Sequence, residues 1–485
     1  MSGRRTACWS LLCFHLAGVP APVRADGIAL GPLYQDFRLT LDVGDRTEAV
    51  GPFYYCERLE DSKLWAVPPV MSYESSSSVD YGRFEFLWKA ITYRRYGDEY
   101  RFQILQLFNV AGGGTQSETN VHRFTLFPLY FHQWSDIPER NYWALVPIYG
   151  TIKDRLFRDE IRFTLFPLYG RTRKRDLVTD NYLYPVFHRR RGDGLTGWQA
   201  WPLVGYEHKD LTWKTNVWGD AEMVGGHDKS FALWPLFLHQ HTGVGTTNEA
   251  RTETLMPFYS FSHAPQRISE SFLWPFGVTH IIDREKKYEE WQAPWPLIVF
   301  AHGEGKTTRR VFPFFSQSHN ATLTSDWYVW PVYKLNRFET ESQARERMRI
   351  LLFLYSDVRA TNKEAQKSLR QIDLWPLFTA RRDFEGRSRL QLLSLVEPIL
   401  PNNRGVENNL SPLWSLWRSE KNRRTGATSQ SLLWNLYRRE TAPERRKCSL
   451  LFGLFQYQSG PTGKRWRLFY LPLGTTPAAA RPASS

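Results

Sequence analysis

The chain has 485 residues, of which 42% are hydrophobic and 23% charged, so it can form a core and lacks the composition of a disordered protein. Aromatic residues make up 15% of the sequence. This excess favours β-strands and is also typical of membrane interfaces. No window holds about 18 consecutive apolar residues, so the sequence predicts no transmembrane helix.

The net charge of +14 attracts polyanions such as nucleic acid, anionic lipid and acidic polysaccharide. The basic residues are spread over turn-like segments along the whole chain, including residues 171–175, 309–310 and 445–447. No single patch and no known nucleic-acid module gathers them. We therefore expect no nucleic-acid partner, and a basic solvated rim that can meet lipid phosphates or an acidic polymer.

The N-terminus has the pattern of a secretory signal peptide. Two arginines precede a short apolar run at residues 7–19, and a small-residue cleavage site ends just before Asp26. We therefore expect residues 1–25 to be removed and the protein to be exported. Cys56 and Cys448 then remain, and they can pair in an oxidising compartment or be unrelated, the second being the favoured interpretation.

A block of the form leucine, aromatic, proline, apolar, aromatic recurs along the chain, as at residues 126–130, 165–169, 233–237 and 374–378. Counting weaker copies, about 24 blocks follow one another at a mean spacing of about 19 residues. The prolines at the repeat centres are Pro128, Pro147, Pro167, Pro185, Pro202, Pro235, Pro257, Pro275, Pro296, Pro313, Pro331 and Pro376. The spacing is too short for two helices and fits a strand of about 13 residues with a turn of about 5.

Segments with turn residues separate the blocks, for example residues 135–138, 191–194 and 461–463. Short turns join antiparallel neighbours, because parallel pairs need long crossovers. We therefore predict an all-β fold, an antiparallel up-and-down meander of about 22–24 strands, closed into a large barrel. This single domain covers residues 26–474, and a disordered polar tail follows at residues 475–485.

The two faces of each predicted strand differ in polarity. Around Pro128, the residues at even offsets are Phe124, Leu126 and Tyr130, which form a long apolar band, whereas odd offsets begin with polar or small residues such as Thr125. A proline in mid-strand removes a ladder hydrogen bond. We expect the prolines to form a row of kinks or bulges that curves the sheet and aids closure. Unpaired carbonyls are costly in lipid, so the same feature counts against a simple membrane barrel.

Five histidines lie at even offsets beyond a central proline, namely His208, His241, His263, His302 and His319. Because adjacent strands run in opposite directions, we expect His208, His241 and His319 at one rim and His263 and His302 at the other. A row of histidines can bind a metal or sense pH, or it can be an amphipathic girdle at an interface. Their spacing contains no metal-ligand pair within a turn or helix, so we predict no metal site.

No catalytic motif stands out. Residues 303–307 resemble the end of a phosphate-binding loop, but Phe300 occupies the position of its first glycine, so we predict a hairpin turn. Carboxylates in the turns can hide a glycosidase pair from distant strands. We predict a protein without enzymatic activity or cofactor, a polysaccharide hydrolase being the minor alternative.

The signal sequence, the strand meander and the aromatic excess together make the chain resemble bacterial outer-membrane β-barrel proteins, in general architecture over residues 26–474. The resemblance implies an outer-membrane location, lipid or lipopolysaccharide as partner, and a pore, transport or envelope-scaffold role. The central prolines, the even turn lengths and the polar C-terminus depart from that pattern. The alternative is a soluble periplasmic or secreted β-repeat protein that binds an acidic polymer through a curved sheet. A barrel needs polar residues at the odd offsets, whereas a packed sheet needs apolar ones.

Overall fold

A computed structural model describes residues 29–114, 120–215, 219–461 and 463–476. These residues form 46 strands, of which 44 belong to one antiparallel sheet. The predicted all-β fold and antiparallel meander are confirmed. The predicted signal peptide and most of the predicted tail lie outside the described residues.

The strands are short, and most have five to eight residues. The N-terminal arm of the sheet consists of β1 (Ala29–Leu30), β2 (Tyr34–Arg38), β3 (Gly44–Ala49), β4 (Tyr54–Leu59), β5 (Ser62–Val67) and β6 (Met71–Ser76). The C-terminal arm consists of β39 (Arg387–Leu392), β40 (Trp417–Asn422), β41 (Thr428–Leu432), β42 (Tyr437–Ala442), β43 (Arg445–Leu450), β44 (Phe455–Gly460), β45 (Gly463–Leu468) and β46 (Leu471–Thr476).

Between the arms runs a long curved wall. Its first half is β7 (Tyr81–Phe86), β8 (Ile91–Tyr96), β9 (Glu99–Ile104), β10 (Phe108–Gly112), β11 (Val121–Leu126), β12 (Tyr130–Ser135), β13 (Tyr142–Leu145), β14 (Tyr149–Arg155), β15 (Arg158–Thr164), β16 (Tyr169–Lys174), β17 (Leu177–Tyr182), β18 (Phe187–Gly192), β19 (Leu195–Ala200), β20 (Val204–Lys209), β23 (Gly226–Ala232) and β24 (Phe237–Val244). Its second half is β25 (Ala250–Leu255), β26 (Tyr259–Ala264), β27 (Arg267–Phe272), β28 (Val278–Asp283), β29 (Tyr288–Gln292), β30 (Ile298–Gly303), β31 (Lys306–Val311), β32 (Phe315–Asn320), β33 (Leu323–Tyr328), β34 (Tyr333–Glu339), β35 (Gln343–Ile350), β36 (Tyr355–Asn362), β37 (Lys367–Leu374) and β38 (Phe378–Arg382).

Each repeat is a hairpin of two strands. β11 and β12 pair from Leu126 opposite Tyr130 to Val121 opposite Ser135, and the Leu129 N–H donates to the Leu126 carbonyl at 2.7 Å. Pro128 therefore occupies the third position of a tight turn, and the bond before it is cis, as in type VI turns. The prediction of one long strand with a central proline is wrong, because a proline fits a turn better than a paired strand. The sheet therefore has about twice the predicted 22–24 strands.

All twelve repeat prolines lie in such turns, and the turns together form one edge of the sheet, here called the proline rim. The opposite edge, formed by turns such as residues 174–177 and 191–194, is called the polar rim. Hydrogen bonds continue from turn to turn along the proline rim, since the carbonyl of Pro167 accepts from the Tyr184 N–H at 2.8 Å and that of Pro202 from the Trp234 N–H at 2.7 Å. The expected row of kinks with unpaired carbonyls is thus replaced by a row of linked turns.

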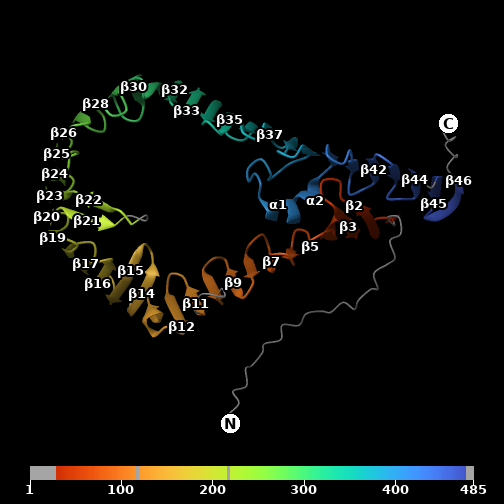
Figure 1. The fold of residues 1–485 in the computed structure, drawn as a ribbon, viewed down its shortest axis with the longest axis horizontal. Coiled ribbons are helices and arrows are strands. Elements are labelled where there is room, and N and C mark those ends of the chain that lie inside the picture. The colour runs from red at the N-terminus through yellow and green to blue at the C-terminus, as the bar shows by residue number, and fades with distance from the viewer. Residues whose placement is uncertain (1–28, 115–119, 216–218, 462, 477–485) are drawn as a thin grey trace, which may run out of the picture.

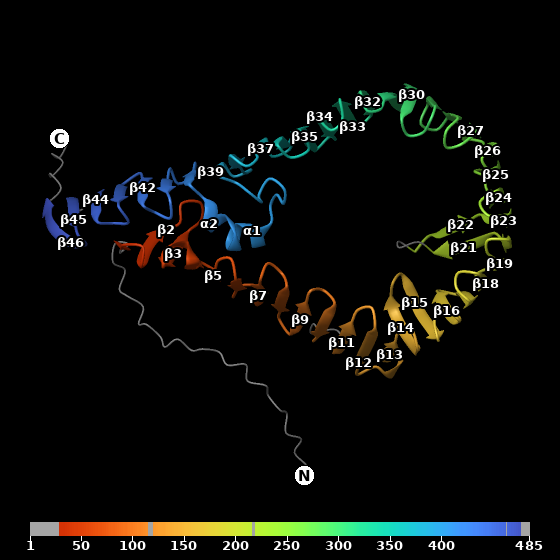
Figure 2. The same cartoon turned by 180° about the vertical axis from the view of Figure 1, so that it is seen from behind.

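The sheet is a narrow ribbon that curves round into a loop, and its two arms converge (Figures 1 and 2). A six-residue strand is about 20 Å long, and 44 strands at about 4.8 Å each give the ribbon a length of about 210 Å. Among the described residues, β1 pairs only with β2 and β46 only with β45, so no strand ladder joins the ends. The hairpin of β21 (Thr212–Thr215) and β22 (Ala221–Val224) extends from the wall into the loop (Figure 1).

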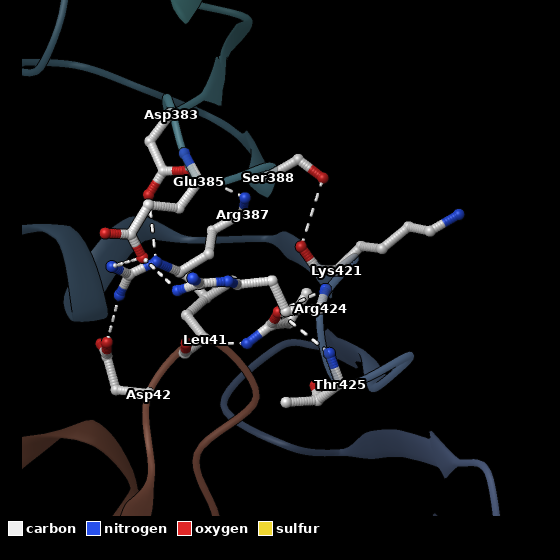
Figure 3. Close-up of polar contacts among 10 residues, drawn as sticks. Leu41, Asp42, Asp383, Glu385, Arg387, Ser388, Lys421, Arg424 and Thr425 are labelled. Carbon is white, nitrogen blue, oxygen red and sulfur yellow. Dashed lines mark hydrogen bonds and ion pairs between the residues drawn. The ribbon is translucent and has the colours of Figure 1, made fainter. Parts of the chain in front are cut away.

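Side chains join the two arms, with α1 (Arg404–Asn409) and α2 (Ser411–Trp414) lying between them (Figure 1). We call this junction the seam. The Tyr55 hydroxyl donates to the Asn408 carbonyl at 2.7 Å, and the Asn409 amide donates to the Ser72 hydroxyl at 2.9 Å. Further contacts across the seam are Asn435 to Glu48, Asn422 to the Leu41 carbonyl, and the ion pair Arg404–Glu74. Figure 3 shows another, the ion pair between Arg387 and Asp42.

The seam also shows which face of the sheet is inside. The Arg438 guanidinium of β42 lies over the Phe37 ring of β2, 3.4 Å from its centroid, so the faces that carry these residues meet. Strand register then assigns every other residue to this inner face or to the outer face. Polar residues dominate the inner face, where hydroxyl pairs such as Thr254 with Ser260 at 2.7 Å recur. Where three residues form the turn, as at Pro128 and Pro202, the odd-offset residues Thr125 and Gln199 lie on this polar inner face.

An apolar cluster breaks this polarity at one place on the inner face. It consists of Phe131, Tyr142, Ala144, Ile152 and Phe163, from β12 to β15. Elsewhere the strands are held mainly by their ladders and by cross-strand pairs. The ribbon is therefore one sheet in thickness, and both of its faces and both of its rims are accessible for function.

Candidate functional site

The proline rim carries a belt of exposed apolar side chains, at least one in each of the twelve repeat-proline turns. Leu129, Leu168 and Leu203 are 51%, 52% and 60% exposed, although each follows a repeat proline in a well-bonded turn. Exposed aromatic residues in the turns along this rim are Phe127, Phe166, Tyr184, Trp234, Trp274, Trp295, Phe314 and Trp330. Monomeric soluble proteins rarely expose a contiguous apolar patch of more than a few hundred Å².

The apolar belt continues onto the outer face for a short distance. Tyr169, Tyr182 and Phe187 are cross-strand neighbours next to the turns, with ring centroids 5.4 and 5.8 Å apart. One step further from the rim, Asp180 pairs with Arg171 at 2.5 Å. The turn and the first one or two outward-facing rows form an apolar band roughly 10–15 Å high, because outward residues are about 7 Å apart along a strand.

The five predicted histidines lie near the polar rim on the outer face. The predicted division between two rims is wrong. Each of these histidines is six residues beyond its repeat proline, and all these prolines lie at the same rim. The strands that carry the histidines are therefore all the second strand of their hairpin and run in the same direction.

Most of these histidines contact a carboxylate. His208 Nδ1 lies 2.5 Å from Asp228, His263 Nε2 lies 3.1 Å from Glu270, and His319 Nε2 lies 3.0 Å from Asp326. His241 and Glu249 form a similar pair. Within the described ranges, no group of three or more His, Cys, Asp or Glu side chains is placed to hold a metal. The row is thus a set of separate acid–base pairs.

Hydrogen bonds to Asp228 and Asp210 raise the pKa of His208. Because the folded pKa is raised, the pair stabilises the fold at low pH and loses this effect as the pH rises through the folded pKa. We expect NMR of histidine-labelled protein to give His208 a titration midpoint above the usual value of about 6.5. Asp228→Asn is expected to lower it and Asp326→Asn to leave it unchanged. A wild-type midpoint at the usual value contradicts the geometry.

The seam contains buried charges that sequence patterns did not reveal. Glu420 is 8% exposed and accepts from Arg418 at 2.6 Å and Arg389 at 3.2 Å. Burial alone raises a carboxyl pKa, but these two arginines outweigh it and lower the pKa of Glu420 to about 2. Across a small cavity of about 70 Å³, this group faces Arg46 and Glu48 of the N-terminal arm. The buried charges of both arms therefore meet.

The structure also describes the glycine-rich segment at residues 303–307, the two cysteines and the C-terminal strand. Residues 303–307 do form a hairpin turn, which joins β30 to β31. Cys56 and Cys448 are free thiols. In the described part of the chain, no helix has the length and apolar composition needed to cross a bilayer. β46 ends at Thr476, two residues inside the predicted tail.

No family model matches this sequence, and no curated protein matches it either. The molecule is therefore described by its fold alone, which is an antiparallel β-ribbon whose two arms meet to form a ring. Its distinguishing features are the apolar proline rim, the charged polar rim, the polar inner face and the seam.

Proposed function

We propose that this protein is an exported membrane protein of the bacterial envelope that binds lipid through its proline rim. The observation that carries the proposal is the belt of exposed apolar side chains on that rim, which has at least one member in each repeat-proline turn. The linked turns support it as well, because backbone groups that enter lipid must be hydrogen-bonded. Outer-membrane lipid or lipopolysaccharide is the proposed partner.

The height of the wall favours insertion into one leaflet. A membrane-spanning strand needs about 9–11 residues, because the hydrocarbon core is about 30 Å thick. Most strands here have six residues, and the apolar band of roughly 10–15 Å matches half of the hydrocarbon core. We therefore propose that the ring rests in one leaflet with its polar rim in water, which differs from a barrel that crosses the bilayer.

The polar inner face favours a water-filled or headgroup-filled opening inside the ring. Pairs of hydroxyl groups such as Thr252–Ser262 and Thr308–Ser318 line it, both at 2.9 Å. A ring with a ribbon length of about 210 Å encloses an area much larger than a solute-selective channel. Among the roles of barrel proteins, a scaffold around a patch of membrane therefore fits better than selective transport.

Flotation of the purified full chain with liposomes tests the proposal. We expect it to float with lipid, and bromines placed along the acyl chains to quench the rim tryptophans, such as Trp234 and Trp330, most strongly at mid-leaflet depth. Quenching strongest at the bilayer centre supports a membrane-crossing wall and contradicts the one-leaflet model. A protein that stays at the bottom of the gradient supports the soluble alternative, in which the sheet binds an acidic polymer.

A further inference from the structure

A cavity of about 610 Å³ lies against the inner face of the ring, apart from the proline rim. Its floor is formed by β35, β36 and β37, and its cover by residues 398–402, which precede α1. This volume is in the usual range for small-molecule sites of about 300–1,000 Å³. The proposed membrane role does not use this cavity.

One part of the cavity lining is apolar. Val358 and Ala360 of β36 project from the floor, with Leu369 of β37 beside them, and Pro398 and Pro401 come from the cover. The surrounding inner face is polar, and the cavity lies apart from the proline rim that is proposed to bind lipid. Neither a strand partner nor a membrane surface therefore accounts for this apolar lining. A ligand with a short apolar portion fits it.

The other part of the lining is cationic. Arg345 and Arg347 line the cavity, and Arg349 follows on the same face of β35. Lys334 of β34 lies directly opposite Arg349 in the strand register. Like charges that face each other across a ladder destabilise a sheet, so this cluster needs a compensating interaction.

The carboxylates nearby do not neutralise the cluster. None of these four cations has an ion-pair partner within the described chain, and the buried Nε of Arg347 has no hydrogen-bond partner. Burial, and then Arg349 and Arg345, lower the pKa of Arg347. Asp373 also lines the cavity and acts on Arg347 without an ion pair, and its oxygens accept from Thr379 at 2.5 Å and from Gln371 at 3.0 Å.

We propose that this cavity binds an amphiphilic anion with a single short apolar chain. An oxyanion head, carboxylate or phosphate, takes the free donors of Arg345 and Arg347, and the positive potential of Arg349 and Lys334 adds to its binding. The chain then lies over Val358 and the proline cover. A fatty carboxylate and a single-chain phosphate share this chemistry, and the cavity volume excludes much larger ligands.

Isothermal titration of the full chain in a nonionic detergent, with laurate and dodecyl phosphate as probes, tests the proposal. We expect saturable binding of one probe per chain, with dodecanol and acetate at least tenfold weaker because each lacks one half of the ligand. The tighter of laurate and dodecyl phosphate identifies the head group. Binding of dodecanol or acetate as tight as that of the probes, or no saturable binding at all, overturns the proposal.

A matched pair of variants separates the site from the general positive charge of the protein. Arg345→Gln/Arg347→Gln is expected to weaken probe binding at least tenfold. Arg337→Gln/Arg382→Gln removes the same charge from exposed positions on the outer face and is expected to leave binding unchanged. An equal loss in both variants means non-specific attraction and overturns the proposal. Flotation with liposomes, measured in parallel, is expected to stay unchanged in both.

Discussion

Liposome binding is expected to fall at least a thousandfold when Leu129, Leu168, Leu203 and Leu236 are all replaced by aspartate. These leucines are exposed on the proline rim, so their replacement removes no core packing. Placing a charged side chain in the apolar part of a bilayer costs roughly 2 kcal/mol or more per site, less near the interface. The four substitutions together therefore cost more than about 4 kcal/mol. A cost of about 4 kcal/mol weakens partitioning into lipid about a thousandfold. The measurement is the fraction of protein that floats across a lipid titration.

The chain offers a control with equally exposed apolar residues away from that rim. Leu156 and Phe157 lie in a polar-rim turn and are 65% and 95% exposed, and Trp213 and Met223 lie on the inward hairpin of β21 and β22. The quadruple aspartate variant of these residues is expected to float like the wild-type protein. If the control also loses binding, general hydrophobicity rather than the proline rim holds the protein on lipid. If the rim variant keeps binding, the proposed interface is wrong.

The sequence predicted the faces of the sheet correctly in some hairpins, such as the one at Pro128, even though it missed the turns. Leu126 and Tyr130 are opposite each other across the three-residue loop at Pro128, so residues at equal distances from the proline form cross-strand pairs. Even offsets therefore stay on one face in this hairpin. At Pro167 and Pro185 four residues form the loop, Thr164 pairs with Tyr169 and Tyr182 with Phe187, and the incoming strand turns its odd offsets to that face instead. The pattern alone does not distinguish a proline in a strand from one in a turn, whereas the rule that proline disfavours paired strands does.

The same error explains the wrong placement of the histidines. With one strand per repeat, His208 and His263 would lie on strands of opposite direction. With two strands per repeat, both lie on the returning strand of a hairpin, at the same height on the outer face. A single wrong count thus placed His263 and His302 at the rim opposite to the other three histidines.

The seam was beyond sequence reasoning for a different reason. Tyr55 and Asn408 are 353 residues apart, and Asn435 and Glu48 are 387 apart. Such contacts depend on the curvature summed over the whole ribbon, which no local pattern encodes. The inner-face cluster did have a local signal, because Arg345, Arg347 and Arg349 alternate along one strand.

Glu420→Gln is expected to lower the stability of the C-terminal arm by about 3 kcal/mol. The fall of the Glu420 pKa from 4.5 to about 2 corresponds to this magnitude, since one unit is worth about 1.4 kcal/mol. The depressed pKa stabilises the wild-type fold above about pH 4.5, and this contribution disappears as the pH falls through about 2. The variant leaves Arg418 and Arg389 buried without their carboxylate partner, which a neutral amide replaces poorly. The measurement is urea denaturation at neutral and acidic pH.

Glu420 faces the N-terminal arm across the seam. Loss of its negative charge is therefore expected to separate the two arms before the strands unfold. Nitroxide labels at Lys63 and Arg423, in a background with all four native cysteines replaced by serine, report the separation of the two arms. We expect a narrow distance distribution for the wild-type protein at neutral pH, and a broad, longer one for Glu420→Gln and for the wild-type protein near pH 2. Glu346→Gln, which breaks the exposed pair with Arg337 on the outer face, is expected to keep the narrow distribution. A distribution that stays narrow in Glu420→Gln would show that hydrogen bonds such as Tyr55 to Asn408 hold the seam without the buried charges.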